Sequence, residues 1–260
     1  MTASQVICDD GTKVVFEVTG EGPPIIFVPG LGDDRRSWSS QVSRFSSDHT
    51  VVTIDNRGVG ESDVPPGPYS VSQMAADAHA VVAATGLSGG TAVGSSMGGA
   101  ICQRWALDYP EDFSRLVITN SWGERTPFTD ALFEHWIGLA ESGSASRILE
   151  SLLLFCFSPD HLARRPQTVA EFLATPPPDL KGFAAAARAC RSHDTAAVAG
   201  QIRHPTLVIA GAFDILTRPA LSERLAARLP NATLRTLPTG HMIFWEMPDP
   251  FNAILAEFIG

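Results

Sequence analysis

Residues 91–107 read Thr-Ala-Val-Gly-Ser-Ser-Met-Gly-Gly-Ala-Ile-Cys-Gln-Arg-Trp-Ala-Leu, and this stretch decides the fold class. At its centre is a G-x-S-x-G motif, Gly94-Ser95-Ser96-Met97-Gly98, between a β-rich run and a helical pattern. In this motif a sharp strand-to-helix turn lifts the serine hydroxyl above the edge of a sheet. The glycines remove the Cβ atoms that would clash at such a turn. We therefore predict Ser96 as a nucleophile.

The motif occurs a second time at Gly86-Leu87-Ser88-Gly89-Gly90. Ser88 precedes the strand-like run instead of following it, and it lies in a Gly-rich segment. Because the motif needs a strand before it and a helix after it, we interpret Ser88 as a loop residue.

Short apolar runs alternate with helical patterns on both sides of the Ser96 motif. Strands are expected at 14–18, 25–28, 51–54, 91–94, 116–119, 207–210 and 233–237, and helices at 72–85, 98–109, 218–229 and 250–259. Near-continuous apolar strands separated by helices indicate a buried, mostly parallel sheet. The fold class is therefore α/β, with helices flanking a central sheet.

One long stretch breaks this alternation. Between Trp122 and His204 the sequence shows helical patterns at 130–141, 146–155, 168–174 and 180–189, but no strand-like run. We predict a core of residues 1–121 and 204–260, with a helical cap, residues 122–203, inserted between two core strands. The cap is expected over the carboxyl ends of the strands, where open α/β sheets bind ligands.

A serine hydroxyl is a weak nucleophile until a base takes its proton. In this fold the acid and the histidine follow the serine in chain order. Asp214 comes just after the expected strand 207–210, and His241 just after the strand 233–237. We predict that His241 is the base for Ser96 and that Asp214 orients it. The alternative for Asp214 is a turn residue before Arg218-Pro219.

The tetrahedral intermediate of acyl transfer needs two N–H donors aimed at its oxyanion. The backbone N–H of Met97, next to the nucleophile, is one expected donor, and that of Leu31, in Pro29-Gly30-Leu31-Gly32, is the other. The alternative for this loop is a plain Gly-rich turn. Phosphate binding is excluded, because there is no GxxxxGK[ST] and the third glycine of a dinucleotide loop is missing.

The chain resembles the 3-oxoadipate enol-lactonase-like group of α/β-hydrolases along nearly its whole length. The matching segments include Gly30-Leu31-Gly32 with Trp38, residues 55–63 (Asp-Asn-Arg-Gly-Val-Gly-Glu-Ser-Asp), residues 94–99, Tyr109-Pro110-Glu111, residues 116–121, residues 205–211 with Asp214, and Gly240-His241 with Glu246 and Pro248. The resemblance implies the triad Ser96, Asp214 and His241, an oxyanion hole of the Leu31 and Met97 amides, and a lid formed by the helical insertion. Residues 55–63 are interpreted as structural, tying down a loop near the site.

The chain departs from this pattern at the oxyanion loop. Many relatives have His-Gly there, whereas this chain has Pro29-Gly30. The cap carries four aromatic residues that are candidates for substrate binding, and their alternative role is packing within the cap: Trp122, Trp136, Phe155 and Phe157.

The composition excludes some partners. The formal net charge is -9, and an acidic chain does not attract nucleic acid or anionic lipid. No segment is apolar enough over enough residues for a signal peptide or a membrane span, and the four scattered cysteines suit a reducing cytoplasm. We expect a cytoplasmic enzyme with no cofactor and no metal site, acting on a small-molecule ester or lactone. A monomer and a homo-oligomer both stay open.

Three functions remain after this reasoning. The first is hydrolysis of an ester or lactone through an acyl group on Ser96. The second keeps the triad but changes the bond, as a C–C bond hydrolase acting on a diketone-like acid or a cofactor-free perhydrolase. Pocket arginines would favour an acid substrate, with candidates at Arg35, Arg36, Arg125 and Arg188. The third is a non-hydrolytic ligand-binding protein.

Overall fold

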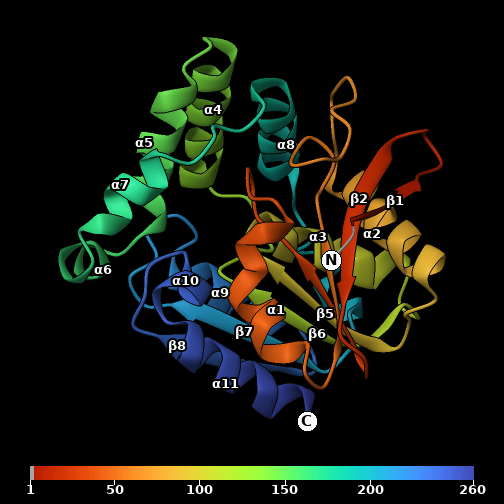
Figure 1. Ribbon diagram of the computed structural model, residues 1–260. Coiled ribbons are helices and arrows are strands. Elements are labelled where there is room, and N and C mark those ends of the chain that lie inside the picture. Colours follow the sequence, from red (N-terminus) through yellow and green to blue (C-terminus); the bar gives the residue numbers. More distant parts are fainter. Residues whose placement is uncertain (1–2) are drawn as a thin grey trace.

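The computed structural model describes residues 3–260 and has an eight-stranded sheet at its centre (Figure 1). The strands are β1 (Ser4–Ile7), β2 (Lys13–Thr19), β3 (Pro24–Val28), β4 (Thr50–Ile54), β5 (Gly90–Ser95), β6 (Phe113–Thr119), β7 (Thr206–Gly211) and β8 (Ala232–Leu237). Their order in the sheet is β1-β2-β4-β3-β5-β6-β7-β8. All neighbouring pairs from β4 to β8 are parallel. At one edge, β2 is antiparallel to both of its neighbours, β1 and β4. The prediction of a mostly parallel sheet is confirmed.

All seven expected strands are present, and β1 is an additional strand. Its four residues are mostly exposed and pair only with β2 at the sheet edge. An edge strand of this kind has no buried apolar face, so its sequence lacks the apolar run that marks β3 or β4.

Helices cover both faces of the sheet. The core helices are α1 (Ser39–Phe45), α2 (Val71–Thr85), α3 (Met97–Asp108), α9 (Pro219–Arg228), α10 (Ile243–Glu246) and α11 (Pro248–Ile259). The step from β3 through α1 to β4 runs in one direction across the sheet, and the later steps run in the other. Because such crossovers are right-handed, α1 lies on one face, while α2, α3 and α9 lie on the opposite face. The short helices α1 and α10 were not predicted from the sequence.

Local signals in the sequence set the ends of α2. Ser70 and Gln73 form a capping box, in which each side chain bonds the backbone N–H of the other residue. Gly86 ends the helix in the left-handed region, with φ of 69°, where glycine carries no steric cost. The helix therefore stops before Ser88 and leaves it exposed in the connection to β5, as the sequence predicted.

The strand order places a crevice at the centre of the sheet. From β3 the chain crosses to β4 on one side, and β5 then pairs with β3 on the other side. Ligands bind at such a switch point, outside the carboxyl ends of the strands. The loop after β3 and the turn after β5 both start at this crevice, and they carry Leu31 and Ser96.

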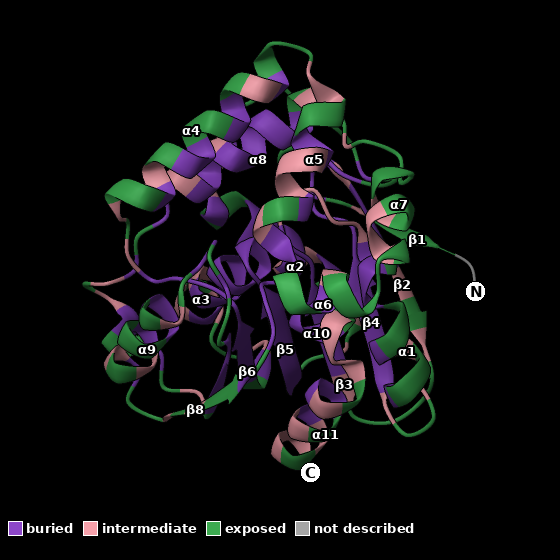
Figure 2. Cartoon of the chain, turned by 90° about the vertical axis from the view of Figure 1, so that its left-hand side faces the viewer, coloured by how far each residue is buried: buried purple, intermediate pink, exposed green. Residues whose placement is uncertain are grey.

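A helical cap is inserted between β6 and β7. It consists of α4 (Pro127–Glu141), α5 (Ala145–Cys156), α6 (Pro159–Arg164), α7 (Gln167–Leu173) and α8 (Leu180–Ser192). In Figure 1 these helices stand above the carboxyl ends of the strands, and in Figure 2 the buried faces of α4 and α8 are turned inward. Four of these helices match helical patterns in the sequence, whereas the six-residue α6 was not predicted. In residues 3–260 we find no helix with the length and hydropathy needed to cross a membrane.

Candidate active site

Ser96 lies on the sharp turn between β5 and α3. Its φ of 53° is one of two positive values among the described non-glycine residues, and strain of this kind persists where the surrounding structure enforces it. A Cβ on Gly94 would collide with the carbonyl oxygen of Gly98, and one on Gly98 with that of Val28. Both glycines of the motif are therefore required by close backbone packing.

Hydrogen bonds hold the Ser96 backbone in this conformation. Its N–H donates to the carbonyl of Thr119 over 2.9 Å, and its carbonyl accepts from the Ser121 hydroxyl over 2.8 Å. Both partners come from the end of β6 and the residues just after it. The turn is thus fixed to the neighbouring strand through backbone atoms of Ser96, and neither of these two bonds uses the Ser96 hydroxyl.

Asp214 and His241 meet beside this turn. The Nδ1 of His241 lies 2.8 Å from Oδ2 of Asp214, and both side chains are buried. Oδ1 of Asp214 accepts from the backbone N–H groups of Leu216 and Thr217, over 2.8 and 3.0 Å, and Oδ2 also accepts from the Thr217 hydroxyl over 2.8 Å. Asp214 therefore stabilises its own turn and also contacts His241. The two alternatives from the sequence, a turn residue and a partner of the histidine, are both compatible with this geometry.

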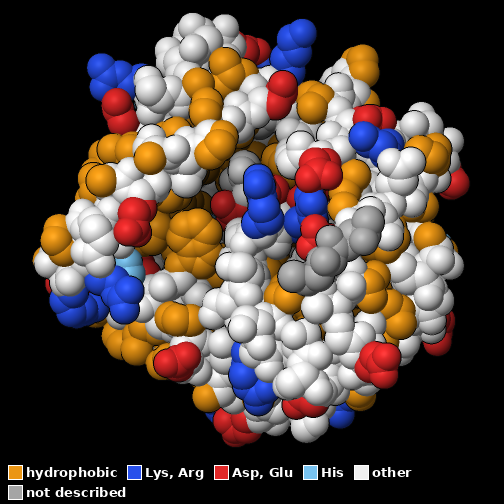
Figure 3. Space-filling model, viewed as in Figure 1, with side chains coloured by type: hydrophobic (Ala, Val, Ile, Leu, Met, Phe, Trp, Pro, Cys, Tyr) orange, Lys and Arg blue, Asp and Glu red, His pale blue; other side chains and the backbone are white. Residues whose placement is uncertain are grey.

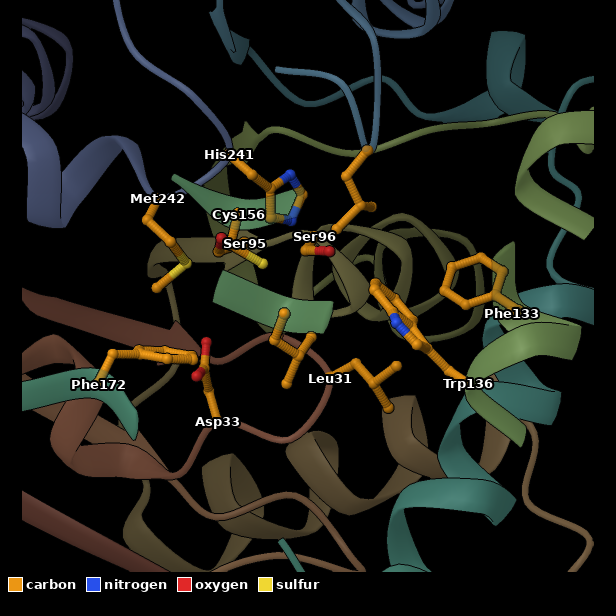
Figure 4. Close-up of a pocket in the computed structure, with 13 residues that line it drawn as sticks. Leu31, Asp33, Ser95, Ser96, Phe133, Trp136, Cys156, Phe172, His241 and Met242 are labelled. Carbon is orange, nitrogen blue, oxygen red and sulfur yellow. The ribbon is translucent and has the colours of Figure 1, made fainter. Parts of the chain in front are cut away.

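Ser96 and His241 line the same cavity. With Nδ1 of His241 turned to Asp214, the other ring nitrogen is left for the cavity, and Figure 4 shows the ring beside the Ser96 side chain. The cavity is also lined by Gly30, Leu31, Asp33, Ser95, Phe133, Trp136, Leu152, Cys156, Phe172, Leu216 and Met242. The structure therefore brings together the three residues predicted from their positions after β5, β7 and β8.

The loop after β3 brings Leu31 to the same cavity. Within residues 3–260 neither the N–H of Leu31 nor that of Met97, at the first turn of α3, has an intramolecular acceptor. Asn56 donates to the carbonyl of Pro29 over 3.1 Å. This bond ties the segment 55–63 to the loop that carries Leu31.

Asn120 joins three strand ends and was not identified from the sequence. Its side chain accepts from the N–H of Gly211 over 2.7 Å and donates to the carbonyls of Gly240 and His241, over 3.1 and 2.6 Å. It is fully buried and has a positive φ of 44°. Asparagine tolerates this conformation better than most residues, which is the one sequence signal that marks the position.

Glu246 connects the cap to the loop that carries His241. Its Oε1 accepts from the N–H groups of Ser158 and Gly240, over 2.8 and 3.1 Å, and its Oε2 from the Ser158 hydroxyl over 2.6 Å. The histidine loop is thus bonded on one side to the cap and on the other to Asn120.

The four cap aromatics occupy different places. Trp136 lines the cavity, and its Nε1 donates to the Ser151 hydroxyl over 2.8 Å. Trp122, Phe155 and Phe157 do not line it as the structure describes it. Trp122 packs on Phe133, Phe155 packs edge-on against Trp136, and Phe157 packs against Phe172. For these three the packing role fits the geometry, whereas Phe133, Leu152 and Phe172 line the cavity without having been selected from the sequence.

Trp136→Phe is expected to favour longer acyl groups. A smaller ring enlarges the cavity, and one methylene in an apolar pocket is worth about 1–3 kcal/mol, or roughly 10- to 200-fold in kcat/KM. We expect the ratio of kcat/KM for p-nitrophenyl hexanoate to that for the acetate to rise at least about tenfold. Trp122→Phe, a matched change outside the lining, should leave the ratio unaltered. Equal ratios in both variants and the wild type would remove Trp136 from the substrate contacts.

Two titratable groups in the cavity have shifted pKa values. Burial raises the pKa of the Cys156 thiol well above its usual value, and the carboxylates of Asp33, Asp214 and Glu246 add to this rise. Since the thiolate is the reactive form of cysteine, Cys156 is a poor competitor to Ser96 as a nucleophile. Burial raises the pKa of Asp33 to about 7, an effect that nearby His241 partly offsets.

The part of the chain that the structure describes contains no group of three His, Cys, Asp or Glu residues arranged to hold a metal ion. The cavity brings together a serine at a strained turn, a histidine bonded to a buried carboxylate, and two backbone N–H groups without an acceptor in the described residues.

Comparison with known proteins identifies the family. The family model described as alpha/beta hydrolase fold matches residues 23–248. A protein of Caulobacter segnis named as a candidate carbamate hydrolase, RutD, is 32% identical over 244 residues, which cover 90% of each chain. A hydrolase from Pseudomonas aeruginosa PA01 superposes with a TM-score of 0.93 at 29% identity, covering 100% of this chain and 98% of the other.

The enol-lactonase from Burkholderia xenovorans LB400 superposes with a TM-score of 0.92 at 25% identity, covering 98% of this chain and 99% of that enzyme. The resemblance noted from the sequence is thus confirmed at the level of the superfamily. The fold, the strained Ser96 turn and these relatives lead to one conclusion: the chain is a hydrolase that belongs to the alpha/beta hydrolase fold family.

Proposed function

We propose that this hydrolase cleaves a carboxylic ester or a lactone through an acyl-enzyme intermediate on Ser96. The observation that carries the proposal is a single cavity lined by Ser96 and His241, with His241 bonded over 2.8 Å to the buried Asp214. A nucleophile, a base and a group that orients the base are the parts that such catalysis requires.

In the first half-reaction, Oγ of Ser96 attacks the carbonyl carbon while Nε2 of His241 takes its proton. Asp214 keeps the proton of the ring on Nδ1 and stabilises the imidazolium that forms. The oxyanion accepts hydrogen bonds from the N–H groups of Leu31 and Met97. The leaving alcohol oxygen then takes the proton from His241, the C–O bond breaks, and the acyl group remains on Ser96.

In the second half-reaction, water replaces the alcohol. His241 removes a proton from the water as it attacks the acyl carbon, the same two N–H groups bind the oxyanion, and Ser96 leaves with the proton returned by His241. For a lactone, the alcohol and the acid stay in one molecule, so the product is a hydroxy acid. The complete reaction consumes only the substrate and one water molecule.

In this proposal residues 122–203 act as a cap that shapes the acyl site, and the substrate is a small molecule. The inner cavity beside Ser96 measures about 30 Å³. Apolar side chains contributed by the cap, among them Phe133, Trp136 and Phe172, account for much of its lining. We infer the cytoplasm as the compartment, because all four cysteines are free, as a reducing environment favours.

The positions of the arginines weigh against the C–C hydrolase of a diketone-like acid. Among the described residues no arginine lines the inner cavity. Arg35 binds Asp55, Arg125 binds Asp130 and Arg188 binds Glu141. Arg36, paired with Asp34, lines only a neighbouring outer cavity. An acidic substrate would therefore find no cation next to Ser96.

The names of the relatives favour the same class of bond. A carbamate and an enol lactone, the compounds in two of these names, both contain a carbonyl carbon bonded to a heteroatom. That bond is the one broken when an acyl group moves to serine.

The test is a substrate panel with product analysis. We expect purified enzyme to hydrolyse p-nitrophenyl acetate and a five-membered lactone, and to transfer the acyl group to added methanol, which acyl-enzymes do in competition with water. Cleavage of a vinylogous 1,5-diketone acid at its C–C bond, faster than any ester or lactone, would overturn the proposal. Ester hydrolysis without methyl ester formation would count against the acyl-enzyme.

A further inference from the structure

Asp33 is an acid in the reaction cavity that the proposed mechanism does not use. It follows the loop Gly30-Leu31-Gly32 directly, and it lines both the cavity beside Ser96 and the outer cavity next to it. Leu152 and Phe172, both from the cap, are the other two residues that line both. Asp33 therefore lies at the junction between the two chambers.

Asp33 and Ser96 both lie close to Gly30 and line the same cavity. A Cβ built on Gly30 would lie 3.4 Å from Cβ of Ser96 and 3.5 Å from Oδ2 of Asp33. A side chain at this position would therefore contact both the carboxylate and the serine. Figure 4 shows Asp33 beside Phe172 at one end of the cavity, with Ser96 between it and the Trp136 and Phe133 end in that view.

The carboxylate of Asp33 has no partner within residues 3–260. Its neighbour Asp34 is paired with Arg36, and Asp55 is paired with Arg35. Asp214 accepts several hydrogen bonds, as described above. The residue is partly exposed and lines two cavities, so a carboxylate with no hydrogen-bonding partner among the described residues is available for a ligand.

We infer that Asp33 selects substrates by charge, so that the enzyme accepts acyl groups ending in a neutral or cationic group and rejects those ending in a carboxylate. This inference rests on the proposed ester or lactone hydrolysis and specifies its substrate class. A carboxylate near Asp33 is repelled, whereas a hydroxyl, an amide N–H or an ammonium group finds an acceptor.

The sizes of the chambers bring the substrate to Asp33. The inner cavity has an accessible volume of about 30 Å³, whereas the outer one measures about 480 Å³ and is the larger of the two. Figure 3 shows the surface hollowed beneath the cap, with hydrophobic side chains on the left of the hollow and both basic and acidic side chains on its right. A substrate with its carbonyl at Ser96 and its remaining part in the outer chamber would pass Asp33 at the junction.

The charge of Asp33 changes near neutral pH, where enzyme activity can be measured. Burial raises its pKa to about 7; nearby His241 lowers the pKa and Asp34 raises it. The other titratable or charged groups around the two chambers are Cys156, with a neutral thiol, Arg36, bound to Asp34, and Asp179, which caps α8. Glu246 is bonded to Ser158 and Gly240. Asp33 is thus charged above about pH 7 and neutral below it.

The test compares two esters of equal acyl length, p-nitrophenyl butyrate and mono-p-nitrophenyl succinate. At pH 8 we expect the wild type to prefer the neutral butyrate on the order of 10- to 100-fold in kcat/KM. Repulsion between two unit charges several ångströms apart gives such a ratio at a protein's effective dielectric constant of about 20. In Asp33→Asn the ratio should fall towards one, chiefly because the succinate is cleaved faster.

Asp48→Asn is the control, because it makes the same change in net charge at an exposed site, beside Arg44 and away from both cavities. It should keep the wild-type ratio. If Asp33→Asn cleaves butyrate normally but keeps that ratio too, charge selection by Asp33 is wrong while ester hydrolysis stands. If the wild type cleaves neither ester, the proposed function itself fails.

A pH series on the wild type gives a second readout that does not depend on the folding of a variant. The ratio of the two kcat/KM values should fall as the pH drops through about 7, because Asp33 takes up a proton. Protonation of His241 affects both esters alike and cancels in the ratio, and the succinate stays ionised because a free carboxyl titrates near pH 4. A ratio that stays constant from pH 6 to 8.5 would contradict the inference.

Discussion

Ser96→Ala is expected to lower kcat for ester hydrolysis by about 10⁴- to 10⁶-fold, the range seen when the nucleophile of a serine hydrolase is removed. The change deletes one oxygen at a turn held by the backbone bonds to Thr119 and Ser121, which alanine keeps. The melting temperature should therefore stay close to that of the wild type. Initial rates on p-nitrophenyl acetate, with a thermal melt of each protein, provide the measurement.

Ser88→Ala is the matched control, since it makes the same substitution in the second G-x-S-x-G match. Ser88 is exposed in the loop between α2 and β5, so we expect a kcat within about twofold of the wild type. Loss of activity in Ser88→Ala with normal activity in Ser96→Ala would reverse the assignment.

Asp214→Asn is expected to lower kcat by about 10⁴-fold, as the corresponding change does in a serine protease. Oδ1 of an asparagine can still accept from the N–H groups of Leu216 and Thr217, which Asp214 Oδ1 accepts now over 2.8 and 3.0 Å. The position that faces Nδ1 of His241 becomes an amide NH₂, which favours the wrong tautomer of the ring. The turn should therefore survive while the base is lost.

This variant separates the two roles of Asp214. If its main role were the turn, Asp214→Asn would show a lowered melting temperature with a near-normal kcat per folded molecule. We expect the opposite combination. The measurement is kcat for the purified variant together with the free energy of unfolding in urea.

The strands and the three predicted catalytic positions follow from the sequence for physical reasons. Parallel strands such as β3 and β4 are buried on both faces, so they appear as unbroken apolar runs. The carboxyl ends of such strands meet at one edge of the sheet, which brings residues just after β5, β7 and β8 together. Chain order and strand ends were therefore sufficient to predict that Ser96, Asp214 and His241 lie together.

The sequence could not predict which side chains face the cavity. Trp122 and Trp136 are both aromatic and fully buried cap residues, yet only Trp136 lines the cavity. The difference depends on how α4 packs against α8 and the core, which periodicity does not specify. Asp33 was missed for a related reason: beside Asp34 it resembles a solvated turn, and its position between two chambers depends on the cap residues Leu152 and Phe172, which line both chambers with it.

The central claim, that Ser96 is the nucleophile, is tested most directly by labelling with a fluorophosphonate, which phosphonylates activated serines. We expect one phosphonyl group per chain by intact-protein mass spectrometry and loss of esterase activity in proportion to labelling. Fragmentation of the peptide that contains Ser95 and Ser96 should place the group on Ser96. An adduct on Ser88 or another residue, or full activity in the labelled protein, would contradict the account.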